Sequence, residues 1–202
     1  MNKLIIALSA FCMLLSPTWS SAADGQQAAS AAPKNHVRLT TNLGDIIIEL
    51  NAEKAPLSVA NFVAYVNKKH YDSTVFHRVI PGFMAQGGGF YRNLNQKETM
   101  PPIQNEADNR LKNIRGSVAM ARTNDPHSAT AQFFINLADN RFLDHTDKSM
   151  RGWGYTVFGK VVEGMDVVYQ IGDSPTGGRG PFPSDVPLRT ITIKSATMID
   201  RK

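Results

Sequence analysis

The amino-acid sequence predicts an all-β domain, built either as a barrel or as a sandwich. Short apolar or alternating runs recur from residue 36 to the C-terminus, turn residues separate most of them, and only two segments have helical periodicity. Many short strands with few helices are typical of both architectures, and periodicity alone does not separate them.

The first two strands are predicted to pair as a hairpin. Apolar and polar side chains alternate over residues 37–41, residues 46–50 are almost continuously apolar, and Asn42-Leu43-Gly44 provides a turn between them. Strand-length runs joined by a short connection containing glycine are typical of a β-hairpin.

Two segments are predicted to be helical. In residues 56–69, Val59, Phe62, Val63 and Val66 recur at spacings of three and four after Pro56, a residue favoured at helix starts. This helix has one apolar face, so we expect it to cover an open end or face of the sheet. Residues 164–171 form a second candidate, with Met165, Val168 and Tyr169 on one face.

Further strands and connections follow from apolar runs and turn residues. The strand candidates are residues 74–79, 83–86, 117–121, 132–137, 156–161 and 188–198. Gly87-Gly88-Gly89 predicts a bulge or tight bend, because the Lys-Ser/Thr pair of a phosphate-binding loop does not follow it. Residues 177–187 are rich in glycine and proline and predict a loop.

The N-terminus has the pattern of an export signal. Lys3 precedes an apolar run over residues 4–15, and the small residues that end at Ala23 offer a cleavage site. The run is shorter than the roughly 20 residues of a spanning helix, which argues against an uncleaved membrane anchor. A lipid anchor on Cys12 is disfavoured because Phe11 precedes it. We expect residues 1–23 to be a signal peptide, residues 24–35 a flexible mature N-terminus and residues 36–202 the folded domain.

Charge and cysteine content exclude several classes of protein. The formal net charge is +5, but the basic residues occur singly or as the pair Lys68-Lys69, so no nucleic-acid interface is predicted. The only cysteine, Cys12, lies in the expected signal peptide. The mature chain would therefore fold in an oxidising compartment without any disulfide.

Residues 76–90, which read FHRVIPGFMAQGGGF, combine one cation with apolar neighbours. Arg78 is followed by Phe83, Met84 and Gln86, an arrangement that suggests an apolar pocket beside a fixed donor. The alternative is an edge arginine whose stem covers apolar surface. A guanidinium stays charged at all working pH values, so Arg78 is not a candidate general base.

Other kinds of active site find little support in the sequence. A second block, residues 120–137, again places an amide, Gln132, beside Phe133 and Phe134. The five histidines form neither an HExxH motif nor an i,i+4 pair, and the sequence has no CxxC, which disfavours a metal site. The absence of a Gly-x-Ser-x-Gly elbow leaves nucleophilic hydrolysis without support.

Three blocks of the sequence resemble the signature blocks of the cyclophilins, which are peptidyl-prolyl cis-trans isomerases. They are residues 76–90, residues 120–136 and residues 157–161, which read VFGKV. The similarity extends over nearly all of residues 36–198, and it is greatest to the periplasmic bacterial cyclophilins. The resemblance implies a closed eight-stranded antiparallel β-barrel capped by two α-helices.

The resemblance also implies a role for individual residues. It places the catalytic arginine at Arg78, whose hydrogen bond would go to the prolyl nitrogen of a twisted X–Pro bond. The implied substrate-binding residues are Phe83, Met84, Gln86, Ala121, Arg122, Thr123, Gln132, Phe134, Phe142, Leu143 and Tyr155.

Three of these positions depart from the pattern of many relatives. Arg122 lies in a segment where relatives often have Ala-Asn-Ala, and we expect it to alter surface charge more than catalysis. Phe142 and Tyr155 stand where many eukaryotic relatives have a tryptophan and a histidine. That tryptophan is associated with tight cyclosporin binding, so the resemblance carries no expectation of inhibitor sensitivity, whereas isomerase activity is expected.

The predicted function is therefore that of a periplasmic peptidyl-prolyl cis-trans isomerase (EC 5.2.1.8) acting on exported chains as they fold. Its partners would be unfolded or partly folded polypeptides that contain proline, and it would work as a monomer without cofactor or metal. One alternative is a proline-recognition or chaperone module whose turnover is incidental. A barrel that carries a lipid or carbohydrate is a weaker alternative, because the family interior is packed with side chains.

Overall fold

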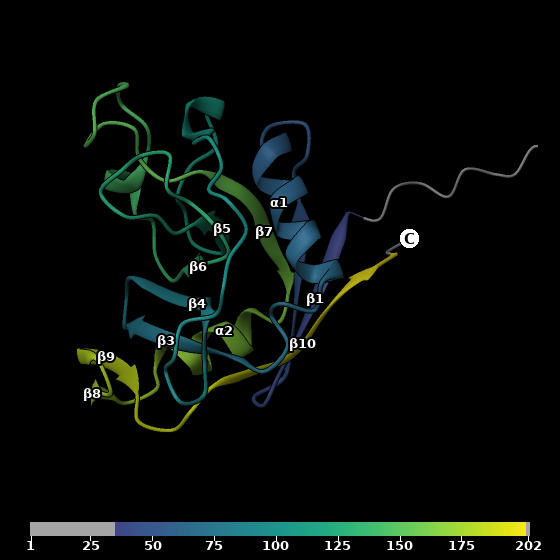
Figure 1. Ribbon diagram of the computed structural model, residues 1–202, viewed down its shortest axis with the longest axis vertical. Helices are drawn as coiled ribbons and strands as arrows, with labels where there is room; N and C mark the ends of the chain where they lie inside the picture. The colour runs from purple at the N-terminus through teal and green to yellow at the C-terminus, as the bar shows by residue number, and fades with distance from the viewer. Residues whose placement is uncertain (1–34, 201–202) are drawn as a thin grey trace, which may run out of the picture. The chain divides into compact units, whose positions relative to one another are not determined.

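A computed structural model describes residues 35–200 (Figure 1). The expected signal peptide and all but the last residue of the expected flexible N-terminus lie outside these described residues. The strands are β1 (His36–Thr41), β2 (Asp45–Leu50), β3 (Thr74–Ile80), β4 (Met84–Tyr91), β5 (Ser117–Met120), β6 (Phe133–Asn136), β7 (Val157–Glu163), β8 (Thr176–Arg179), β9 (Phe182–Pro187) and β10 (Thr192–Ile199). The helices are α1 (Pro56–Asn67) and α2 (Met165–Gly172), with short 3-10 helices η1 (Ala107–Asn109) and η2 (Arg141–Leu143).

Eight of the strands close into a barrel in the order β1-β10-β3-β4-β6-β5-β7-β2. All of its neighbouring strands are antiparallel, and β1 closes the ring by pairing with both β10 and β2. The structure therefore confirms the barrel and excludes the sandwich. Closure leaves these eight strands without a free edge, which removes a route to aggregation.

The N-terminal hairpin has the expected register. Val37 lies opposite Ile48 and Leu39 opposite Ile46, and all four side chains are buried in the barrel. The turn between the strands is held by Thr41, whose Oγ1 donates to Gly44 O at 2.7 Å. Alternation therefore identified both the strands and the faces that they bury.

The two helices cover opposite ends of the barrel. Helix α1 begins shortly after the C-terminal end of β2, whereas α2 follows the end of β7, where Glu163 pairs with Ile47 near the start of β2. Buried side chains of both helices, among them Phe62 and Ile171, join the central core. The predicted helices are confirmed, although α1 ends at Asn67, two residues earlier than expected.

Aromatic side chains fill the interior of the barrel. The ring of Phe62 on α1 lies 5.0 Å from those of Tyr71 and Phe158 and 5.5 Å from that of Phe133. These four residues are fully buried, as are the aliphatic side chains that surround them. A packed interior of this kind supports a site on the outside of the barrel and leaves the carrier alternative without support.

The triple glycine forms the predicted bulge within β4. The register of β3 against β4 shifts twice between Thr74 and Arg78, opposite the glycines. Gly88 adopts φ +85°, and a Cβ atom there would lie 2.8 Å from the ring of Tyr71. Both the backbone angle and the close approach require glycine.

The prediction of a loop for residues 177–187 is wrong, because most of this segment forms the β8–β9 hairpin. Thr176 pairs with Pro187 and Arg179 with Phe182. Phe182 and Val186 pack with Val75, Phe90 and Leu94 in a small apolar cluster. The glycines and prolines of this segment suggested a loop, but Val186 is buried and Phe182 is partly buried against β3 and β4. Their burial orders the segment as a hairpin.

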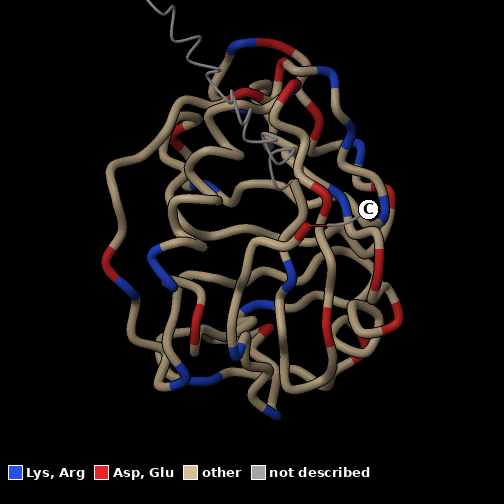
Figure 2. The backbone as a smooth tube through the Cα atoms, turned by 90° about the vertical axis from the view of Figure 1, so that its right-hand side faces the viewer, with Lys and Arg blue, Asp and Glu red and all other residues tan. Residues whose placement is uncertain are grey.

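Charged residues are distributed over the chain rather than gathered in one stretch. Figure 2 shows basic and acidic positions interspersed along the described backbone. In the same part of the chain, no helix has the length and apolar character that crossing a membrane requires.

Candidate active site

A row of side chains across four strands forms the centre of the site. Arg78 on β3 pairs with Gln86 on β4, Gln86 pairs with Phe134 on β6, and Phe134 pairs with Ala119 on β5. Directly paired residues in a sheet point to the same face. The four side chains therefore share one face, and it is the outer face, because Phe133 and Val79 next to them belong to the central core.

An apolar cluster lies on this same outer face. Met84, Ala119, Phe134 and Val157 are buried in it, and partly buried side chains surround them: Ile80, Phe83, Leu111, Ala121, Leu143 and Tyr155. The cluster contains six of the predicted substrate-binding residues, which come from five separate segments of the chain. The structure thus brings together the apolar wall that the sequence predicted.

The predicted polar contacts lie beside that wall. Gln86 Nε2 donates to Gln132 Oε1 at 2.9 Å, so the two amides form one unit at its edge. Arg78 is exposed over 47% of its side chain, an exposure compatible both with a donor to a ligand and with an arginine whose stem covers apolar surface. A half-exposed guanidinium next to an apolar cluster is available to a ligand that enters it.

Asp185 is a member of this site that the sequence analysis missed. Its Oδ2 atom lies 3.5 Å from Arg78 Nε. The residue belongs to β9, within the segment that was expected to be a loop. No sequence signal connects it to Arg78, because the contact depends on how the β8–β9 hairpin packs against β3.

The segment from Ala121 to Thr123 borders the cluster. Ala121 N donates to Gln132 O at 2.9 Å, and Thr123 N donates to Ser128 Oγ at the same distance. In the described part of the chain, no hydrogen bond uses the main-chain N–H or C=O of Arg122. These groups are therefore available to the main chain of an extended peptide.

The side chain of Arg122 contacts Gly154 and Tyr155, next to the apolar cluster. Its Nε donates to Gly154 O at 2.9 Å, and its guanidinium lies over the ring of Tyr155, 4.5 Å from the centroid. Tyr155 in turn meets Phe134 edge to face at 5.7 Å. The arginine thus helps to hold Tyr155 in place, which its surface position alone did not suggest.

Phe142 lies at the rim of the site. It is 75% exposed, and its ring stacks on that of Phe83 at 5.6 Å. Because η2 presents Phe142 outward and Leu143 toward the cluster, the two neighbours have different surroundings. An exposed aromatic ring of this kind offers contact area to a bound peptide.

A buried network of asparagines supports the apolar wall from behind. Asn140 Nδ2 donates to Phe83 O at 2.8 Å and to Asn136 Oδ1 at 2.7 Å, and Asn136 Nδ2 donates to Asn113 Oδ1 at 3.2 Å. Asn113 Nδ2 donates to Leu143 O at 3.3 Å and to Tyr155 O at 3.2 Å. The network therefore ties together the three segments that carry Phe83, Leu143 and Tyr155.

Replacement of Asn140 by alanine tests this support. The change leaves Asn136 Oδ1 buried without its donor, so the free energy of unfolding should fall by about 2 kcal/mol. We also expect KM for a proline peptide to rise, because Phe83 loses one of its anchors. Urea unfolding and steady-state kinetics measure the two effects. Asn124→Ala, at an exposed position, is the matched control, and equal behaviour of the two variants would contradict the proposed support.

His77 directly precedes Arg78 in β3 and is 3% exposed. Its ring packs at 4.4 Å from Phe90 and 5.6 Å from Phe182, and its Nδ1 has no hydrogen-bond partner among the described residues. Burial, assisted by the charge of Arg78, lowers the pKa of His77 from 6.5 to about 4. The residue is therefore neutral at physiological pH, and it packs against the apolar cluster that contains Phe90 and Phe182.

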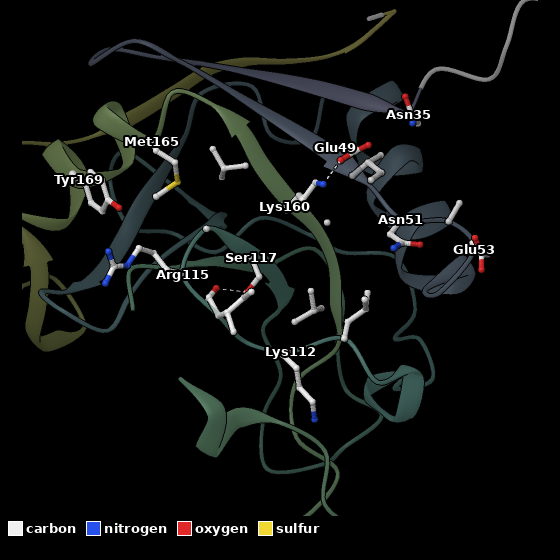
Figure 3. Close-up of a pocket in the computed structure, with 18 residues that line it drawn as sticks. Asn35, Glu49, Asn51, Glu53, Lys112, Arg115, Ser117, Lys160, Met165 and Tyr169 are labelled. Atoms are coloured by element: carbon white, nitrogen blue, oxygen red, sulfur yellow. Dashed lines mark hydrogen bonds and ion pairs between the residues drawn. The ribbon is translucent and has the colours of Figure 1, made fainter. Parts of the chain in front are cut away.

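A cavity of about 820 Å³ lies next to the candidate site (Figure 3). It is lined mainly from β2, β7, α2 and the segment 111–117, and it shares Leu111 and Val157 with the apolar cluster. Its clearest polar contact, Lys160 Nζ to Glu49 Oε2 at 2.8 Å, is an ion pair between its own walls. Over residues 35–200, no group of three or more His, Cys, Asp or Glu side chains could hold a metal ion.

The fold and the candidate site together define a class of protein: a closed β-barrel that presents an apolar cluster on its outer face, beside a half-exposed arginine. The family model described as cyclophilin type peptidyl-prolyl cis-trans isomerase matches residues 36–198. The chain belongs to this family, and it is accordingly an enzyme of the isomerase class. The resemblance read from the three sequence blocks is confirmed.

Individual relatives agree with this assignment. The chain is 58% identical over 164 residues to a peptidyl-prolyl cis-trans isomerase of Streptomyces antibioticus, an alignment that covers 81% of this chain and 98% of the relative. It is 53% identical over 174 residues to peptidyl-prolyl cis-trans isomerase A of Dickeya dadantii, covering 86% and 90% of the two chains. Peptidyl-prolyl cis-trans isomerase B of Escherichia coli is 54% identical over 162 residues, covering 80% and 98%.

Solved structures of cyclophilins share the fold. A Cryptosporidium parvum cyclophilin type isomerase, crystallised in the presence of the dipeptide Ala-Pro, superposes with a TM-score of 0.66 at 27% identity and covers 82% of this chain and 99% of its own. The cyclophilin AquaCyp293 from Hirschia baltica also gives a TM-score of 0.66, at 28% identity, covering 83% and 75% of the two chains.

Proposed function

We propose that this isomerase accelerates rotation about X–Pro bonds by donating a hydrogen bond from Arg78 to the prolyl nitrogen. The observation that carries the proposal is the register of β3, β4 and β6, which sets Arg78, Gln86 and Phe134 in one row beside a buried apolar cluster. A proline ring is an apolar group that would pack against that cluster. The nitrogen of the same ring would lie at its edge, toward the arginine.

The chemistry of the amide explains why an arginine donor would be effective. Conjugation gives the peptide bond a rotational barrier of about 18–20 kcal/mol. Twisting the bond returns the lone pair to the prolyl nitrogen, which then accepts a hydrogen bond that the planar amide accepts poorly. A donor that binds the twisted form more tightly than the planar forms lowers the barrier.

The other residues of the site would bind and orient the peptide. Phe83, Met84, Phe134 and Leu143 would hold the proline ring and keep water away from it, and Gln86 and Gln132 would contact the neighbouring peptide groups. The unused main-chain groups of Arg122, between Ala121 and Thr123, would pair with an extended substrate, with Phe142 and Tyr155 at the rim. No step in this scheme needs a metal, a cofactor or a covalent intermediate.

We further propose that the substrates are exported chains that are still folding in the periplasm. The support is the sequence pattern of residues 1–23, which is typical of a cleaved export signal ending near Ala23. Residues 24–35 would then be a flexible mature N-terminus, residues 36–202 the isomerase domain, and the mature enzyme a monomer. Cell fractionation with N-terminal sequencing of the mature protein tests the export, and a full-length cytoplasmic product would contradict it.

A cis–trans assay on a short proline peptide tests the activity against the alternative of a binding module. We expect the wild-type protein to accelerate isomerisation well beyond the uncatalysed rate, whose time constant is tens to hundreds of seconds. Titration of the same peptide, followed by the fluorescence of the protein, gives its affinity. Tight binding without acceleration would identify a proline-recognition module instead.

A further inference from the structure

The β8–β9 hairpin brings a carboxylate to the cation of the site. Asp185 Oδ2 lies 3.5 Å from Arg78 Nε, and the two side chains are 32% and 47% exposed. We propose that Asp185 is a positioning residue for Arg78, holding the Nε side of the guanidinium so that its two terminal amino groups remain available to the substrate. This inference rests on the proposed function, because it assigns importance to the orientation of Arg78.

Asp185 is held in place by the residues around it. Val186, the next residue, is buried in the cluster formed with Val75 and Leu94. Phe182, three residues before Asp185, meets the ring of Phe90 edge to face at 5.1 Å. The carboxylate therefore lies between two apolar anchors, and its position relative to β3 is determined before any substrate binds.

The backbone at Asp185 is also unusual. Its φ angle is +67°, in the left-handed region that most residues with a side chain avoid. Aspartate and asparagine adopt this conformation more readily than other non-glycine residues. Residues in sparsely populated backbone conformations are enriched at functional sites, and here the strained residue is the one that faces Arg78.

The chemistry of arginine makes orientation the relevant effect. A guanidinium remains charged at any working pH, so Asp185 is not needed to keep Arg78 protonated. The side chain has several rotatable bonds, and a free arginine samples many orientations that do not point at the prolyl nitrogen. A carboxylate on the Nε side restricts these orientations in advance, which is preorganisation of a transition-state donor.

The variant Asp185→Asn tests the proposal, because asparagine has nearly the same shape and tolerates the left-handed backbone. From the strength of partly exposed ion pairs, we expect kcat on a proline peptide to fall about 2- to 5-fold, with KM nearly unchanged. The conservative variant Asp185→Glu should recover part of the loss. Asp166→Asn removes an exposed carboxylate from α2 and is the control for the change in net charge.

A second readout reports on the ion pair directly. The Nε–H resonance of Arg78 in the free enzyme, assigned from its loss in Arg78→Ala, should shift and exchange faster with water in Asp185→Asn. High salt should reduce the kinetic difference between wild type and this variant, because salt screens exposed charges. An unchanged kcat, or a lowered Tm with unchanged kcat, would overturn the positioning role. That result is distinct from failure of the proposed function, which would appear as full activity in Arg78→Ala.

Discussion

Replacing Arg78 with alanine is expected to reduce kcat/KM on a proline peptide by about 10²- to 10³-fold, the loss typical of removing one donor aimed at a transition state. The effect should fall mainly on kcat, because the proposed hydrogen bond forms only when the peptide bond is twisted. The apolar cluster remains in the variant, so the affinity for the peptide should change little. A protease-coupled cis–trans assay measures kcat and kcat/KM, and direct titration of the peptide measures its affinity.

The variant should remain folded, since 47% of the Arg78 side chain is exposed and its ion pair with Asp185 is partly exposed too. Far-UV circular dichroism and Tm check this. Arg115→Ala is the matched control, because Arg115 is an exposed arginine that lines the 820 Å³ cavity and not the site. Arg78→Lys keeps the charge but loses the planar fork, and it should recover only a small part of the activity. Activity close to wild type in Arg78→Ala would refute the assigned role.

Acid is expected to destabilise the protein through His77. Its pKa of about 4 in the folded protein lies below its ordinary value of 6.5, so between these pH values the unfolded chain binds the proton and the folded protein does not. Stability therefore falls as the pH falls through this window and is fully present above pH 6.5. At 1.36 kcal/mol for each unit of pKa, the loss approaches about 3 kcal/mol near pH 4.

Urea unfolding between pH 4 and pH 8 measures this dependence. His77→Phe should flatten it, because phenylalanine does not titrate and matches the aromatic contacts with Phe90 and Phe182. Burial also lowers the pKa of His70, so part of the slope will persist in the variant. Asn124→Ala, which changes an exposed residue that does not titrate, is the control and should keep the wild-type slope. Identical pH profiles for wild type and His77→Phe would contradict the assignment.

Those two predictions depend on neighbouring residues of β3, where a shift in the register against β4 falls between Phe76 and Arg78. His77 points to the apolar cluster beneath the β8–β9 hairpin, whereas Arg78 points to the row shared with Gln86 and Phe134. Phe76 and Val79, on either side of the pair, both belong to the central core, so the shift in register and not strict alternation gives the two side chains different surroundings.

Local patterns in the sequence were sufficient to predict most of the elements. Alternation located the hairpin of β1 and β2, helical spacing located α1 and α2, and the triple glycine located the bulge in β4. These features depend on interactions between residues that are close in the chain, so a single sequence contains them. The similarity of residues 76–90 to a family signature extended the prediction to Arg78 and the apolar wall.

Tertiary structure alone decided the partner of Arg78 and the network behind the wall. The strand patterns did not separate barrel from sandwich, because both use the same patterns, and only the resemblance of three blocks to a family indicated a closed barrel. The carboxylate of Asp185, in a segment predicted to be a loop, reaches Arg78 only because Phe182 and Val186 bury against β3 and β4. Asn113, Asn136 and Asn140 carry no motif, and their bonds join distant segments. Local sequence determined which faces are apolar, whereas the packing of those faces determined which polar groups meet.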